Sequence, residues 1–152
     1  MELNSTKIKI YLNKLNEDNN PSWGIMNSCQ MLYHCNKYIE VSFGIKKIYF
    51  VNRILFRVFF RCFFLQYLKH IEFDITKFKK NSTTLKVFKS YPLSIGFNNE
   101  KERLIQNLNK VQNINAKIIH HQLYGNISSN LFKKLIAFHT SYHFSQFGIL
   151  SD

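Results

Sequence analysis

The residue pair best placed to do chemistry is His139 and His143, which form an H-x-x-x-H pattern near the end of the chain. Residues four apart on a helix project from the same face, so the two imidazoles lie close enough to bind one metal ion. Position 140 is Thr, so the zinc-protease pattern H-E-x-x-H lacks its catalytic glutamate here. The pair therefore indicates a metal site without metalloprotease chemistry.

A third ligand is available from another helix. His34 lies on an apolar stripe, and helical bundles assemble metal sites from facing helices. We predict that His34, His139 and His143 bind a divalent ion, with zinc or nickel best suited to imidazole. Three neutral imidazoles leave one coordination position open, as in catalytic zinc sites, where it lowers the pKa of a bound water or thiol. We expect His121 and Gln146 to orient the ligating rings.

Buried histidines without a metal are the competing interpretation. A histidine on an apolar stripe is usually satisfied by a backbone carbonyl, although two of them four residues apart must both find partners away from water. Glu40 is six positions from His34 and lies off its face, so no carboxylate base accompanies the histidines. Spacing alone leaves both interpretations open.

Hydrophobic periodicity predicts the helices that position these residues. They form one domain, residues 1–152, which we expect to be an all-α antiparallel four-helix bundle with one shorter helix. A long irregular connection over residues 70–96, with one short strand at 85–88, precedes the shorter helix. The expected helices run from Asn4 or Ser5 to Leu15, from Asn27 or Ser28 to a stop at Gly44, over 47–68, over 99–113 with Asn99 as N-cap, and from the N-cap Ser128 to Phe147.

Residues 48–68 are long and apolar enough to imitate a membrane span. Three arginines at positions 53, 57 and 61 share one helical face, and each costs roughly 2.5–3.5 kcal/mol near the centre of a bilayer. We therefore expect no membrane span. The favoured interpretation is a core helix with a solvated arginine ridge, whose other sides carry the phenylalanines Phe56, Phe59, Phe60, Phe63 and Phe64.

Composition limits the function classes. The chain has 152 residues, of which 45% are hydrophobic and 16% aromatic, with only 2 Pro and 5 Gly, so it is neither disordered nor collagen-like. Its net charge of +12 leaves a basic nucleic-acid-binding module with structural histidines as an alternative function. The basic residues are spread along the chain, however, and favour solubility over a binding patch. An inactive scaffold is the third alternative.

The cysteines and the N-terminus indicate a compartment. Cys29, Cys35 and Cys62 are odd in number and form no C-x-x-C pair, and the first residues contain no apolar stretch of a secretory signal. Both observations predict a reducing cytoplasm.

Two blocks of sequence resemble the DinB-like superfamily, and in particular a branch with W-G-K-M…Q-M-L-x-H-C and H-L-D-H-H-L-R-Q-F-G blocks. Residues 21–35 read PSWGIMNSCQMLYHC, residues 121–128 read HQLYGNIS, and residues 139–148 read HTSYHFSQFG. The chain departs from the branch at Ile25, Gln122, Phe132 and Tyr142, none of which is an expected ligand.

The resemblance implies a DinB-like four-helix bundle that binds a metal through His34, His139 and His143. It implies a small-molecule substrate and, as in characterised relatives, a metal-dependent thiol transferase that uses a low-molecular-weight thiol, or a hydrolase. Homodimers are common among those relatives. The substrate and the reaction stay open at this point.

Overall fold

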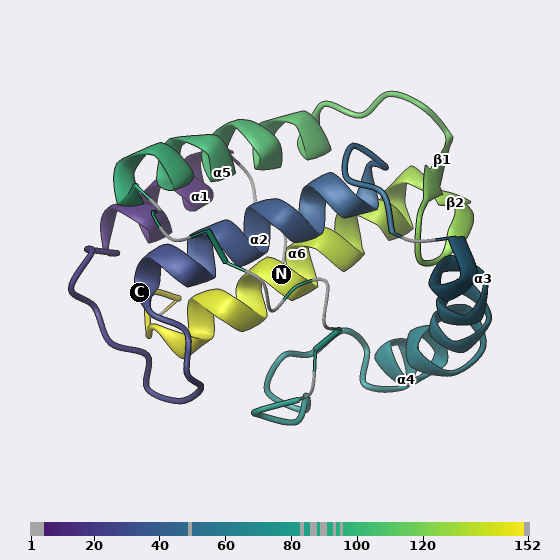
Figure 1. Cartoon of the computed structure of the whole chain (residues 1–152), viewed down its shortest axis with the longest axis horizontal. Coiled ribbons are helices and arrows are strands. Elements are labelled where there is room, and N and C mark those ends of the chain that lie inside the picture. The colour runs from purple at the N-terminus through teal and green to yellow at the C-terminus, as the bar shows by residue number, and fades with distance from the viewer. Residues whose placement is uncertain are drawn as a thin grey trace.

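The computed structural model describes residues 5–48, 50–82, 84–85, 88, 91–92, 94 and 96–150. Four helices lie along one another, and a further helical stretch stands at one end of them beside a small sheet (Figure 1). The elements are α1 (Ser5–Asn13), α2 (Ser28–Ser42), α3 (Phe50–Phe59), the π-helical η1 (Phe60–Phe64), α4 (Leu65–His70), α5 (Phe97–Gln112), β1 (Ile118–His121), β2 (Gly125–Ser128) and α6 (Ser129–Gln146).

The prediction of an all-α four-helix bundle is wrong, because the described residues combine helices with an antiparallel sheet. Strand β1 pairs with β2, with Ile118 opposite Ser128 and His121 opposite Gly125. Gly125 has a φ of +71°, which glycine adopts without the steric cost of a Cβ. The hairpin escaped the sequence analysis because four residues per strand are too few for a period of two to stand out.

The predicted starts of the two histidine-bearing helices are confirmed. The Asn27 side chain accepts the backbone N–H of Gln30, and the Gln30 side chain accepts that of Asn27, which completes a capping box for α2. Ser128 caps α6 by accepting the N–H of Leu131. The chain leaves α2 at Gly44, whose φ is +80°. These local signals fix where each helix begins, and hence which face presents its histidines.

The core lies between the long helices. Helix α2 packs against α5 on one side and α6 on another, while α1 packs against α5. Apolar side chains at helical spacing on each of them are fully or almost fully buried, which supplies most of the driving force for this arrangement. They include Ile8, Leu12, Leu15, Met31, Leu32, Leu104, Leu108, Phe132, Ile136 and Phe144.

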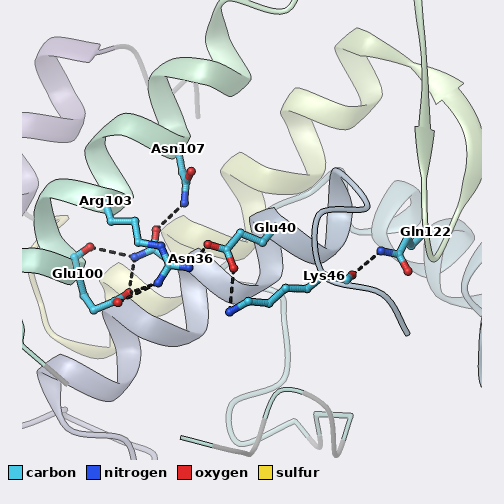
Figure 2. Close-up of polar contacts among 7 residues, drawn as sticks. All are labelled: Asn36, Glu40, Lys46, Glu100, Arg103, Asn107 and Gln122. Carbon is cyan, nitrogen blue, oxygen red and sulfur yellow. Dashed lines mark hydrogen bonds and ion pairs between the residues drawn. The ribbon is translucent and has the colours of Figure 1, made fainter. Parts of the chain in front are cut away.

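A polar network joins α2 to α5 within this packing (Figure 2). The buried Glu40 carboxylate pairs with Arg103 and, at 2.9 Å, with Lys46. Arg103 also pairs with Glu100 at 2.8 Å. The Asn36 amide nitrogen donates to Glu100 at 2.8 Å, and the Asn36 oxygen accepts from Asn107 at 2.9 Å. The network thus combines opposite charges with amide groups that bond to each other.

Of the arginines predicted to form a solvated ridge on α3–η1–α4, Arg61 is exposed and Arg57 is half-buried. Arg57 Nη2 lies 3.1 Å from His120 Nε2, and Arg61 donates to the carbonyl of Tyr124, so both side chains hold the helix against the hairpin. Phe59 and Phe63, expected in the core, are instead 51% and 66% exposed. The Arg53 and Phe56 side chains lie outside those described. Among the described residues, no helix combines the length and the apolar character needed to cross a bilayer.

The connection between α4 and α5 is irregular in its described residues, as predicted. The strand expected at 85–88 lies partly outside the described residues, as does Asn4, one of the two proposed caps of α1. The Asn99 cap is wrong, because α5 already begins at Phe97 and Gly96 occupies its N-cap position. The N-cap of α5 therefore lies three residues earlier in the chain than expected.

Candidate metal centre

The three predicted ligands meet between α2 and α6. His34 comes from α2, whereas His139 and His143 lie one turn apart on α6, whose ribbon runs beside α2 in Figure 1. One ligand atom from each ring lies within 4.8 Å of the other two. His34 and His143 are buried, and His139 is half-buried. Residues more than 100 positions apart thus form one cluster, as the sequence predicted.

The rings approach one another closely. His34 Nε2 lies 3.2 Å from His139 Nε2. Ring centroids are 4.6 Å apart for His34 and His143, and 4.6 Å apart for His139 and His143. Two imidazole nitrogens bound to one tetrahedral zinc at 2.0–2.1 Å are about 3.3 Å apart. The spacing of the first pair therefore matches a shared ion.

Hydrogen bonds at the outer nitrogens fix how two of these rings face. His34 Nδ1 lies 3.3 Å from the Phe88 carbonyl, and His143 Nδ1 lies 2.5 Å from Gln146 Oε1. Because both partners are acceptors, each Nδ1 carries the proton and each Nε2 keeps a lone pair. This is the outer hydrogen bonding that orients metal-bound histidines in proteins. Gln146 therefore has the contact expected of it.

His139 is held by packing. Its ring stacks on Tyr38 with 3.8 Å between centroids and an interplanar angle of 11°. Its Nδ1 is buried and has no hydrogen-bond partner among the described residues. Tyr38 was not identified as a site residue from the sequence, although it follows His34 by one helical turn on the same face.

Burial keeps the cluster neutral. Loss of solvent lowers the pKa of His34 to about 4 and that of His143 to about 3. The pKa of His139 is also well below its usual value, first through burial and then through the neighbouring His143 and His34. Neutral imidazole is the form that binds a metal, so at pH 7 all three rings are in the ligating state.

The turn that precedes α2 packs on Gln146. Gly24 has a φ of +91°, and a Cβ placed there would lie 2.7 Å from Gln146 Nε2. The backbone N–H of Ser22 donates to the Gln146 carbonyl at 2.7 Å, and Gln146 Nε2 lies 3.4 Å from the Trp23 carbonyl. This turn therefore limits where the Gln146 side chain can lie, and through it the His143 ring.

His121 lies in the hairpin rather than against the metal ligands. Its Nδ1 accepts the N–H of Leu123 at 3.1 Å, and its Nε2 is buried without a described partner. Burial lowers the pKa of His121 to about 3. Its ring centroid lies 6.4 Å from that of Tyr38, the ring on which His139 stacks.

A large cavity borders the histidines. Its volume is about 1440 Å³, and all three rings contribute to its wall. The wall is mainly apolar, with aromatic side chains from α3, η1 and α4, and its described residues include no Asp or Glu. The sequence did not predict this cavity, because it depends on how α3–η1–α4 stands against α6.

Comparisons with protein-family models, with curated proteins and with solved structures found no match to this chain.

Proposed function

We propose that this protein binds a divalent metal ion through His34, His139 and His143 and uses it on a small molecule in the adjacent cavity. The observation that carries the proposal is the orientation of the rings. His34 and His143 place their protons on the outer nitrogens, so their unprotonated nitrogens are the ones left to converge near His139. His34 Nε2 and His139 Nε2 lie 3.2 Å apart, close enough to share either one proton or one metal ion, and a cation bound there would draw on the lone pairs of all three rings.

Zinc or nickel is the expected ion, since both suit imidazole ligands. Held by the three histidines, such an ion would supply Lewis acidity that lowers the pKa of a water or thiol. The chain's own groups then orient the ligating rings and shield the site from water. Phe88 and Gln146 fix the His34 and His143 rings, Tyr38 packs on His139, and the aromatic wall limits the access of water.

The described cavity wall contains no carboxylate that could serve as a base, so the chemistry we propose relies on a nucleophile activated at the ion. Transfer of a low-molecular-weight thiol and hydrolysis are the two reactions of this kind. Both agree with the proposed relationship to the DinB-like superfamily, which is supported by the meeting of its two histidine-bearing blocks. A cytoplasmic location and a homodimer complete this proposal.

Elemental analysis tests the metal site. The protein is purified without a His tag, treated with chelator, and reconstituted with zinc or nickel. Wild type is expected to hold about one ion per chain, and the His34→Ala/His139→Ala/His143→Ala variant none. The exposed His70 provides a matched control, because His70→Ala removes an imidazole from α4 and should leave the metal content unchanged.

Circular dichroism and thermal unfolding establish that the triple variant is still folded. A wild-type protein that takes up neither metal overturns the proposal. Equal metal content in the wild type and in a folded triple variant does so as well.

A further inference from the structure

The cavity beside the histidines is polar at one end and apolar at the other. At the polar end, a Cβ built on Gly24 would lie 2.7 Å from Gln146 Nε2 and 4.0 Å from Asn81 Oδ1, so these two amides flank the same turn. Gln146 contacts His143 at 2.5 Å. Two hydrogen-bonding groups of the wall are therefore linked to the histidine end through the Gly24 turn and Gln146.

The opposite end is built from the helical stretch α3–η1–α4. Leu55, Phe59 and Phe60 line it together with Tyr124 from the hairpin, whose ring lies 5.8 Å from that of Phe60. Leu55 is 67% exposed and Phe59 is 51% exposed, so this wall continues to the molecular surface. Exposed apolar residues beside a pocket mark an entrance for an apolar ligand.

A row of ring contacts links the two ends. Phe60 contacts Phe64 at 5.3 Å, Phe64 contacts Phe78 at 6.2 Å, Phe78 contacts Tyr142 at 5.0 Å, and Tyr142 contacts His143 at 5.3 Å between centroids. All these residues line the cavity. The wall is thus apolar from the exposed helix up to the histidine cluster.

Charge selects the head group of a ligand. Among the described wall residues there are no acidic side chains, and Lys79 is the one Lys or Arg. The chain as a whole carries a net charge of +12. An anionic head group is favoured over a cationic one by both facts.

From this arrangement we infer that the cavity binds a linear amphiphile with a single carboxylate, with its alkyl chain along the aromatic wall and its carboxylate at the histidine end. The inference rests on the proposed function for the head group, because it places the carboxylate beside the metal ligands. The volume of about 1440 Å³ exceeds the roughly 300–1,000 Å³ of pockets for drug-sized molecules and leaves room for a long chain.

Calorimetric titration with unbranched carboxylates from butanoate to dodecanoate tests the site, on zinc-loaded and on chelator-treated protein. Affinity should rise by about fourfold for each added CH₂, because burying one CH₂ contributes about 0.8 kcal/mol to the binding free energy. Decanoate should bind zinc-loaded protein at least about tenfold more tightly than decylamine, whose head group has the opposite charge.

Two neighbouring phenylalanines provide matched variants. Phe59 and Phe63 both lie on the same helical stretch and are similarly exposed, but Phe59 lines the cavity and Phe63 is not among its lining residues. Phe59→Glu should weaken decanoate binding by about tenfold or more, while Phe63→Glu should leave it unchanged. Both variants should keep the wild-type metal content and melting temperature.

The two proposals fail in different ways. Metal uptake without any dependence of affinity on chain length overturns the amphiphile site and leaves the metal site standing. Equal weakening by Phe59→Glu and Phe63→Glu also overturns the amphiphile site. A steep dependence of affinity on chain length in a protein that takes up no metal supports the chain-binding wall and overturns the proposed function. In that case Lys79 is the one described cation of the wall that can favour carboxylate over amine.

Discussion

Two polar clusters share helix α2, and they differ in the charges that their members carry. In the Glu40 network, a carboxylate meets two cations and the amides of Asn36 and Asn107 bond to each other. In the histidine cluster, three neutral rings converge and His139 Nδ1 has no described partner. The first cluster is held by opposite charges, with Glu40 Oε2 in an ion pair with Lys46 that is not a hydrogen bond, and this is the pattern of a structural lock. The second brings three neutral ring nitrogens together without an acidic partner among them, which is the pattern of a cation-binding site.

The largest difference we expect between the clusters is in their response to acid. The native pKa values of His34 and His143, about 4 and about 3, lie below the unfolded value of 6.5, so the unfolded chain binds more protons below pH 6.5. Native stability is therefore full above pH 6.5 and falls as the pH drops towards 4. At pH 5 the lowered pKa values of these two rings together reduce the free energy of unfolding by about 4 kcal/mol.

Urea unfolding of metal-free protein at pH 7 and pH 5 measures this loss. The triple histidine-to-alanine variant should lose at least about 4 kcal/mol less over the same interval, since it also lacks His139, whose pKa is lowered too. His121 is present in both proteins and cancels from the comparison. Identical pH dependence in the two proteins would show that the cluster does not stay neutral in the native state.

Breaking the Glu40 network should lower stability by nearly as much as the acid titration of the histidines. Arg103→Met leaves the buried Glu40 carboxylate with Lys46 as its remaining ionic partner, so the free energy of unfolding at pH 7 should fall by about 3 kcal/mol. The control is Lys77→Met, which removes a cation 3.9 Å from the carboxylates of Glu72 and Asp74 at the surface and should change stability by less than about 0.5 kcal/mol. A loss below 1 kcal/mol for Arg103→Met would argue against a structural lock.

Variants of two buried glutamines distinguish an effect on metal binding from an effect on stability. Gln146 accepts from His143, whereas Gln122 donates to the Lys46 carbonyl and accepts the N–H of Ile48. Gln146→Ala should weaken zinc binding by about tenfold to a hundredfold, because the His143 ring loses the group that orients it. Gln122→Ala should lower stability by about 1–2 kcal/mol and leave zinc affinity unchanged. Competition with a chelating dye measures both affinities, and a reversed pattern would contradict the assignment.

The smallest effect concerns the glycine that faces Gln146. Gly24→Ala and Gly148→Ala both place a Cβ at positive φ, and each should cost about 1 kcal/mol of stability. At Gly148 the new methyl group meets nothing within 4 Å, whereas at Gly24 it displaces the Gln146 side chain. Zinc affinity should therefore fall by about tenfold or less for Gly24→Ala alone. An equal change in both variants would remove the turn at Gly24 from the metal site.

Local signals made part of this structure predictable. The Asn27 and Ser128 caps act within three residues, and they place His34, His139 and His143 on inward faces. Contacts that join distant segments were not predictable. The Phe88 carbonyl lies 54 residues from His34 in the sequence, and no residue type marks a carbonyl as a partner.

The helical stretch α3–η1–α4 illustrates a second limit of prediction from sequence. Periodicity indicates which residues share a face, but residues 50–70 carry apolar side chains on almost every side, so it cannot say which face turns inward. Arg57 and Arg61 turn towards the hairpin, and Phe59 and Phe63 turn outward. The short hairpin that decides this orientation was itself invisible to the pattern.

The π-helical turn η1 gives this helix an unusual tolerance in chain length. Leu65 N–H bonds to the Phe60 carbonyl, five residues earlier, so the turn accommodates one residue more than an α-helical turn does. Deleting one residue within Phe60–Phe64 would convert it to an ordinary turn and leave Leu65 and Leu68 directed towards the core. The same deletion within α3 would rotate the two sides of the helix by about 100° relative to each other. The aromatic wall can therefore lose a residue at this one turn while the packing on either side keeps its register.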